Sequence, residues 1–303
     1  MANNLFTVIG RAHGGKGAGH RFGNLVFAYL TAKHLNADFF IESKDMRKAG
    51  EHGNYPDMQL LFNFTAVEAP IHVKTNTVVT SVKEAMRAKH AGQKVVLAQI
   101  GAFFDWPNAY NAARPFFQTL HKHSETAPIQ FHHVAPAPKG SLTVAWHVRV
   151  GDILLRSEQF YQNVFETIIS IANRLHLLVT HYLVSQNARS VLRTMPNVYS
   201  KMDYVASTNF LNDILCMARA DILVSSGSSL VQIPAIIAHP QQVFIESPPK
   251  EHVEKRRNNI DKSWQTFHLH GSVPVNETGI IKATEISRLF RRLTLYSETI
   301  YQP

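Results

Sequence analysis

The chain has 303 residues, 45% of them hydrophobic, which is enough for one large domain or for two domains of about 150 residues each. Its 31 Lys and Arg residues outnumber its 22 Asp and Glu residues, and the formal charge of +9 favours anionic partners such as nucleotides or phosphosugars. Basic residues form no run longer than Lys255-Arg256-Arg257, and no stretch of about eighteen apolar residues occurs. We therefore expect a protein without a nucleic-acid-binding face and without a transmembrane segment.

The cysteine content indicates the compartment. The chain has one cysteine, Cys216, and it lies inside an apolar pattern with helical spacing. A single cysteine excludes an intramolecular disulfide and favours a reducing compartment. The amino terminus lacks a basic region followed by a hydrophobic stretch, so we expect no secretion signal and a cytoplasmic location.

Short strand-like runs alternate with helical segments along the chain. The strand candidates are Leu5 to Ile9, Asp38 to Ile41, Thr77 to Thr80, Lys94 to Ile100, Leu142 to Val148, Leu177 to Val184, Asp221 to Val224 and Gln241 to Ile245. Apolar residues recur every three or four residues in Asn24 to Leu35, Pro107 to His121, Glu158 to Leu175, Phe210 to Ala220 and Ser229 to Ala238. The alternation predicts an α/β protein with parallel sheets covered by helices.

A proline-rich segment divides the pattern. His133 to Gly140 contains two prolines and a glycine and interrupts the periodicity. We predict an amino-terminal lobe over 1–138, a second lobe over 139–280 and a cleft between them. Lys282 to Tyr296 carries apolar residues on one face and arginines on the other, so residues 281–303 are predicted to form a terminal helix that packs back across the lobes.

A glycine-rich stretch, Gly10 to Asn24, follows the first predicted strand. A turn of this kind brings backbone N–H groups and a helix amino terminus to an anion. Gly10, Gly15 and Lys16 fit a P-loop, but Gly17 stands where the magnesium-binding hydroxyl belongs. A P-loop kinase or NTPase is thus a minor alternative. Asn24 is expected at the helix N-cap.

The segment Leu142 to Asp152 carries the strongest signal. Its apolar run is typical of a buried parallel strand, and Gly151 and Asp152 end that strand in a turn. Ligands of open α/β sheets bind outside the carboxyl ends of the strands, where His147 and Arg149 are expected to lie. A guanidinium keeps its charge and matches two phosphate oxygens, so Arg149 is a candidate diphosphate ligand.

The segment Asn212 to Pro234 predicts a second part of the same site. A helix, a short strand and a Ser-Ser-Gly-Ser-Ser turn are followed by another helix. Ser228 and Ser229 are expected at its amino terminus, where hydroxyl and N–H donors favour a phosphate or serve as ordinary caps. Asp213, on the preceding helix, is suited to accept the paired N–H donors of a guanine edge.

Three stretches together resemble one family, the fucosyltransferases that use GDP-fucose: the core α-1,6, bacterial nodulation, α-1,2 and protein O-fucosyl enzymes. His147 to Asp152 is similar to their His-x-Arg-(Arg)-Gly-Asp motif, with Val150 in place of the second arginine found in many members. Arg21-Phe22-Gly23-Asn24 looks like the amino-terminal Gly-Arg-Phe-Gly-Asn turn, although His20 separates it from Gly19. Asp213 to Ser229 resembles the core-enzyme segment that ends in a paired-serine turn.

The resemblance implies a GT-B fold with two Rossmann-like lobes and inverting transfer of L-fucose from GDP-fucose to a glycan or other hydroxyl acceptor, without a metal. By this likeness Arg149 would hold the β-phosphate, His147 and Asp213 the guanine, and Ser228 and Ser229 a phosphate. Arg21, Gly23 and Asn24 would contact the donor from the first lobe. The chain independently lacks an Asp-x-Asp motif to hold a divalent ion, so no metal or other cofactor is expected.

An inverting transfer requires a base that accepts the proton of the attacking hydroxyl. Glu158, which opens the helix after the His-x-Arg loop, is the first candidate and Asp152 the second. A favourable charge in the first turn of that helix explains Glu158 equally well. A GT-B enzyme with another nucleotide sugar, such as a rhamnose or xylose donor, is the nearest alternative function, and a nonenzymatic sugar- or nucleotide-binding protein stays open.

Overall fold

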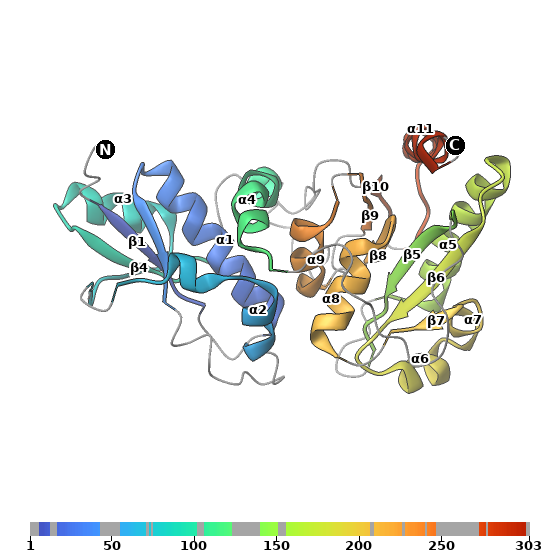
Figure 1. Cartoon of the computed structure of the whole chain (residues 1–303), viewed down its shortest axis with the longest axis horizontal. Helices are drawn as coiled ribbons and strands as arrows, with labels where there is room; N and C mark the ends of the chain where they lie inside the picture. The colour runs from blue at the N-terminus through green and yellow to red at the C-terminus, as the bar shows by residue number, and fades with distance from the viewer. Residues whose placement is uncertain are drawn as a thin grey trace, which may run out of the picture. The chain divides into compact units, whose positions relative to one another are not determined.

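The computed structural model describes residues 6–12, 17–42, 55–70, 73, 75–101, 106–122, 140–150, 156–206, 209–225, 228–239, 241–246, 273–276 and 278–300. The chain forms two compact units, Met1–Thr126 and Ala127–Pro303. Each has a parallel sheet with helices packed on it (Figure 1). The expected α/β class with two Rossmann-like lobes is therefore confirmed. The predicted linker lies outside the described residues except for Gly140.

The first unit contains a parallel sheet of order β2-β1-β4-β3. Its strands are β1 (Thr7–Gly10), β2 (Asp38–Ile41), β3 (Val78–Val79) and β4 (Val95–Ala98). Its helices are α1 (Ala18–His34), α2 (Tyr55–Leu61), the 3-10 helix η2 (Phe64–Val67), α3 (Val82–His90) and α4 (Trp106–Leu120). Helix α1 packs on β1, β2 and α4, while α3 packs on β3 and β4.

Aromatic side chains form much of the core of this unit. Phe22 stacks on Phe62 at 5.4 Å between ring centroids and meets Phe117 edge to face at 5.0 Å. All three rings are fully buried. Because such pairs add to the free energy of burial, they fix α1 against α4 and the segment after α2.

Helix α3 begins with a capping arrangement that the periodicity did not identify. The N–H of Glu84 donates to the Ser81 hydroxyl at 3.2 Å, and the Glu84 carboxylate accepts from the N–H of Thr80 at 2.7 Å. Ser-x-x-Glu is a sequence signature for a helix start, so this helix was predictable from its cap.

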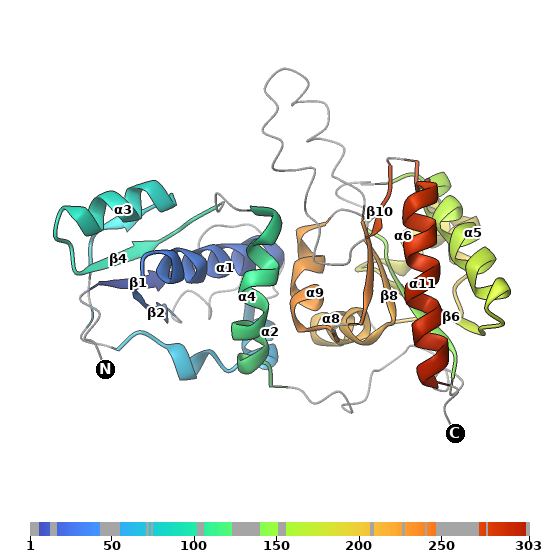
Figure 2. The same cartoon turned by 90° about the horizontal axis from the view of Figure 1, so that it is seen from above.

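The second unit contains a parallel sheet of order β10-β9-β8-β5-β6-β7. Its strands are β5 (Leu142–His147), β6 (Val179–Val184), β7 (Tyr204–Val205), β8 (Ile222–Ser225), β9 (Val243–Glu246) and β10 (Val273–Pro274). The helices are α5 (Glu158–Arg174), α6 (Ala188–Thr194), α7 (Pro196–Tyr199), α8 (Phe210–Arg219), the 3-10 helix η3 (Ser229–Val231), α9 (Gln232–Ile237) and α11 (Ala283–Ile300). Helices α8 and α9 lie on one face of the sheet, with α5 and α11 on the other (Figure 2).

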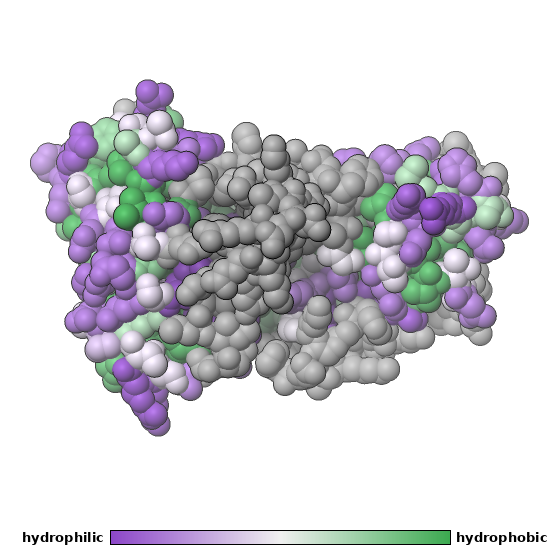
Figure 3. Space-filling view, turned by 180° about the vertical axis from the view of Figure 1, so that it is seen from behind, coloured by the Kyte–Doolittle hydropathy of each residue, from purple (hydrophilic) through white to green (hydrophobic). Residues whose placement is uncertain are grey.

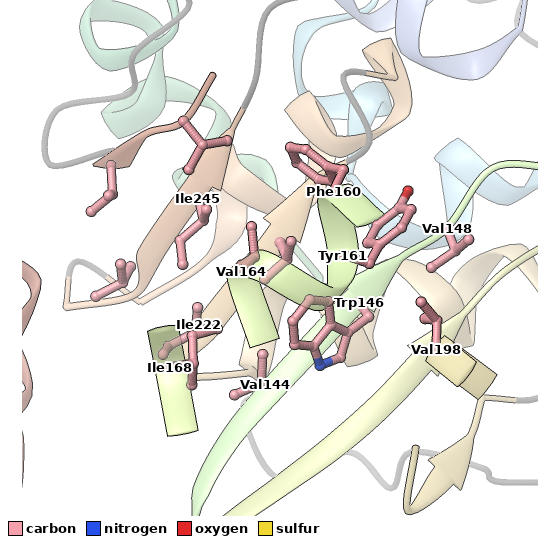
Figure 4. Close-up of a cluster of buried hydrophobic side chains, with 14 of the residues drawn as sticks. Val144, Trp146, Val148, Phe160, Tyr161, Val164, Ile168, Val198, Ile222 and Ile245 are labelled. Carbon is pink, nitrogen blue, oxygen red and sulfur yellow. The ribbon is translucent and has the colours of Figure 1, made fainter. Parts of the chain in front are cut away.

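The sheet faces follow the alternation of side chains along β5. Val144 and Trp146 lie in an apolar cluster with α5 residues such as Val164 and Ile168 (Figure 4). His147 has the opposite parity and is the last residue of the strand. Period-two alternation therefore directs the core residues to α5 and leaves His147 for the carboxyl edge of the sheet.

The terminal helix follows its predicted apolar stripe. Leu289 and Leu293 of α11 are buried in the cluster formed with α5, and the Arg174 guanidinium lies 4.8 Å from the centre of the Phe290 ring. These contacts dock α11 on the second unit. Packing across both lobes stays a prediction.

On the face shown in Figure 3, the coloured residues are mainly hydrophilic, with apolar areas between them. The exposed large apolar residues of the described chain are far apart in the sequence and include Leu60, Val78, Leu178, Leu192 and Leu295. No helix within the described ranges is both long and apolar enough to cross a membrane.

Candidate functional site

The candidate site lies at the carboxyl edge of the second sheet, where the strand order reverses. From β5 the chain builds β6 and β7 on one side, then returns to place β8, β9 and β10 on the other. Ligands of doubly wound sheets bind at such switch points. Here the point lies between β5 and β8. The last residues of β5, β8 and β9 are His147, Ser225 and Glu246, and all three are buried polar side chains.

Arg149 and Ser228 meet at this switch point. The Arg149 Nη1 atom lies 3.5 Å from the Ser228 hydroxyl oxygen, although 79 residues separate them along the chain. This distance is at the outer limit of a hydrogen bond. The two groups are therefore neighbours, and the bond between them is weak. The two groups that the sequence assigned to one phosphate site are therefore brought together.

His147 is electrically neutral at physiological pH. Burial, with a further contribution from the Arg149 charge, lowers the pKa of its imidazole to about 4. Its backbone carbonyl accepts a hydrogen bond from the Tyr161 hydroxyl at 3.4 Å, which ties the end of β5 to α5. A neutral imidazole offers one donor and one acceptor, which is suited to a heterocyclic base.

Asp213 lies in the first turn of α8, the helix that contacts β5 and β6. The residue as a whole is half-buried, but its Oδ1 atom is buried and accepts no hydrogen bond from any residue that the structure describes. Burial raises the pKa of this carboxyl to about 8. Burial and then the Asp213 charge also raise the pKa of Cys216, which is buried as the apolar pattern indicated.

The serine turn leads into a helix, as expected, but the helix has two parts. Ser229 opens the 3-10 helix η3, and α9 follows from Gln232. The Ser228 hydroxyl accepts the N–H of Leu230 at 3.4 Å. Ser228 thus has the ordinary capping contact and the Arg149 contact together. The predicted helix is present, and its first turn is a 3-10 turn because the chain tightens there to i→i+3 bonding.

Glu158 opens α5, as predicted, and its carboxylate is bound to α7. It accepts hydrogen bonds from the backbone N–H groups of Asn197 at 2.7 Å and Val198 at 3.3 Å, and from the Asn197 side chain at 3.3 Å. These bonds satisfy free donors at the amino terminus of α7. The assignment of Glu158 as the base stays a prediction, beside a structural role that the contacts supply. Asp152, the second candidate, lies outside the described residues.

Arg21, Gly23 and Asn24 lie inside α1. The helix begins at Ala18 with Gly17 at the N-cap, so the expectation that Asn24 caps it is wrong. Gly19 and Gly23 are buried and four residues apart, so they share a helix face instead of marking a turn.

Polar side chains of α1 are also inward-facing. Arg21 is buried at 7% exposure. With its amide oriented to satisfy both neighbours, Asn24 donates to the carbonyl oxygens of Ile100 at 3.2 Å and His20 at 3.3 Å. Asn24 therefore ties α1 to the segment that follows β4. Contact of this residue, or of Arg21 and Gly23, with a donor stays a prediction.

Two buried ionisable residues at the carboxyl edge did not appear among the sequence-based candidates. Glu246 ends β9 at 6% exposure, and Arg156, which precedes α5, is 3% exposed. An acid directly after the apolar run of β9 was the available signal, because polar residues at the carboxyl ends of parallel strands face the ligand crevice. Across the described part of the chain, no group of three His, Cys, Asp or Glu side chains is arranged to hold a metal ion.

The chain was compared with protein families, curated proteins and solved structures, and only solved structures are similar to it. No protein-family model matches the chain, and no match appears among curated proteins. A structure of fucosyltransferase NodZ from Bradyrhizobium is 11% identical, with a TM-score of 0.42 over 77% of this chain and 93% of that one. A NodZ α-1,6-fucosyltransferase structure soaked with GDP-fucose is 12% identical, with a TM-score of 0.40 over 77% and 92%.

Proposed function

We propose that this chain is an inverting, metal-independent glycosyltransferase that transfers L-fucose from GDP-fucose to a glycan or another hydroxyl acceptor. The observation that carries the proposal is the meeting of Arg149 and Ser228 at the switch point of the second sheet. It joins two of the three stretches that resemble GDP-fucose-dependent enzymes. His147, at the end of β5, and Asp213, in the first turn of α8, have the donor and acceptor chemistry that a guanine base requires.

Arg149 is assigned to the diphosphate. When the bond between the anomeric carbon and the β-phosphate oxygen breaks, negative charge develops on GDP. A guanidinium held at a strand end and the donors of Ser228 and Ser229 are suited to stabilise it without reorganisation. Arginine replaces, in this proposal, the divalent ion that other nucleotide-sugar enzymes use.

The base completes the reaction. The acceptor oxygen attacks the anomeric carbon, its proton passes to a carboxylate, and GDP leaves from the opposite face. Glu158 and Asp152 are the two candidates. The Glu158 carboxylate already binds the amino terminus of α7, and this contact favours Asp152 as the base. If Glu158 is the base, Glu158→Gln abolishes transfer and leaves GDP binding intact. Turnover near the wild-type rate would mean that Glu158 serves only to bind the amino terminus of α7.

Calorimetric titration with GDP, UDP and ATP, with and without magnesium, tests the donor. We expect GDP binding that needs no magnesium and that Arg149→Ala weakens by about 10- to 100-fold, the value of a charge-assisted hydrogen bond. Arg189→Ala, an exposed arginine on α6, is the matched control and should bind normally. A preference for UDP favours a different nucleotide sugar, and magnesium-dependent ATP binding favours a kinase or NTPase; both outcomes contradict the proposal.

The transfer itself is tested with a donor-saturated screen of sugar and peptide acceptors. Release of GDP together with a fucosylated product supports an enzyme. GDP-fucose that stays intact with every acceptor and with water supports a nonenzymatic binding protein. The proposed setting is the cytoplasm, where the buried Cys216 thiol stays reduced.

A further inference from the structure

Glu246 is a buried acid with an unused oxygen. It is 6% exposed, and its Oε2 atom forms no hydrogen bond with any residue in the described part of the chain. Burial of a polar atom without a partner is unfavourable, and native structures rarely retain one without a reason. A binding role is one such reason, because a ligand can supply the missing partner.

The position of Glu246 is that of a ligand-binding residue. It ends β9, where it pairs in register with Ser225 at the end of β8. Its backbone carbonyl accepts the N–H of Val275 at 3.0 Å, which fixes the strand end against the segment after β10. Strand β8 is also the neighbour of β5, so the acid lies one strand beyond the switch point that Arg149 and Ser228 occupy.

Arg156 is the charged neighbour of this acid. Among the described residues it is the one charged group that acts on the Glu246 carboxyl, and it favours the ionised form. The stronger influence is burial, so the pKa of Glu246 is raised to about 8. At neutral pH the carboxyl is therefore mainly protonated, with one O–H donor and one acceptor oxygen.

We propose that Glu246 binds a pair of adjacent hydroxyls of the nucleotide sugar, on the ribose or on the transferred sugar. The inference rests on the proposed function. A hydroxyl both donates and accepts, so it satisfies Oε2 in either protonation state of the acid. A phosphate oxygen can accept a hydrogen bond only from the protonated carboxyl group, and the ionised carboxylate repels it. Phosphate is therefore the less suitable partner.

The test compares ligands that differ in their hydroxyls. Binding of inorganic pyrophosphate, GDP, 2′,3′-dideoxy-GDP and GDP-fucose is measured by calorimetry for the wild type and Glu246→Met. Glu166→Gln, an exposed acid on α5, is the control. We expect Glu246→Met to weaken a hydroxyl-bearing ligand about tenfold, the effect of one or two lost hydrogen bonds, and to leave pyrophosphate binding unchanged.

The arms of this experiment identify the hydroxyls. If the ribose is bound, the variant weakens GDP and loses nothing with dideoxy-GDP. If the transferred sugar is bound, GDP is unaffected and GDP-fucose is weakened. Equal affinities for every ligand, or an equal loss that includes pyrophosphate, overturn the inference.

Folding and the underlying function have separate readouts. The melting temperature reports whether Glu246→Met folds. If it does not, Glu246→Asp takes its place, because it keeps the acid and withdraws it from the ligand by one methylene. A wild-type protein that binds no GDP refutes the proposed function and this inference together. Wild-type binding of both GDP and GDP-fucose that depends on Arg149 and not on Glu246 refutes this inference alone.

Discussion

GDP binding is predicted to depend on the protonation of Asp213. Burial raises the pKa of this carboxyl to about 8 in the free protein, so at pH 7 about nine molecules in ten hold the proton. The donor edge of guanine needs an ionised acceptor. Binding must therefore expel the proton, and affinity should rise as the pH approaches the pKa of the free carboxyl.

The magnitude follows from that pKa. If the bound carboxyl stays ionised throughout, the Kd for GDP should fall about tenfold from pH 6 to pH 7, about 50-fold from pH 6 to pH 8, and little above that. Neutral His147 does not oppose this trend, since the pKa of its imidazole is about 4 and it does not titrate in the range.

Calorimetry at several pH values, repeated in buffers of different ionisation enthalpy, measures both the affinity and the protons released. GDP also titrates, so each affinity is divided by that of Asp213→Asn, which should bind more weakly and lack the protein's contribution to the slope. Asp38→Asn, an exposed acid of the first unit, should behave as wild type. Equal pH slopes for the wild type and Asp213→Asn, with no proton released, would refute the assignment of Asp213 to guanine.

Three changes in the second unit should alter the free energy of unfolding, with a glycine of the first unit as a control. Gly279 has a φ of +82° and a Cβ there would lie 2.1 Å from the Phe160 carbonyl oxygen, so Gly279→Ala should lower the free energy of unfolding by at least about 2 kcal/mol. Gly92→Ala, at a φ of +78° in open space, should lose only about 1 kcal/mol in the same denaturant titration, and equal losses would contradict the steric argument. Glu158→Ala should lower the free energy of unfolding by about 1 kcal/mol through lost bonds to α7, and an unchanged chemical denaturation midpoint would argue against that cap. The pKa of Glu246 is raised from 4.5 to about 8 in the folded protein. Below pH 4.5 this shift leaves the free energy of unfolding unchanged. Between pH 4.5 and about pH 8 it lowers the free energy of unfolding, because only the unfolded state ionises in that range. Between pH 5 and pH 8 the wild type should therefore lose on the order of 3 kcal/mol more unfolding free energy than Glu246→Gln. Identical pH dependence of the unfolding free energy in the two proteins would disprove the raised pKa.

The local pattern of apolar residues was sufficient to predict most helices and strands of the second unit. The apolar run of β5, the helical spacing of α5 and α8, and the short strand β8 each appear in consecutive residues, because burial imposes a period of two or 3.6 on the sequence. The polar residues that end β5 were recognisable for the same reason. The start of α1 was misjudged because buried glycines four apart on a helix resemble a glycine-rich turn when only the sequence is considered.

The sequence by itself determined the α/β class, the two lobes and the residues that reach the carboxyl edge of a strand. Only the tertiary structure decided that Arg149 lies beside Ser228, that Glu158 binds α7 and that Glu246 is buried without a partner for Oε2 within the described residues. The physical reason is that strand order, and not chain order, selects which loops are neighbours. Burial then raises the pKa values of Asp213 and Glu246 through surroundings that no short segment of the chain contains.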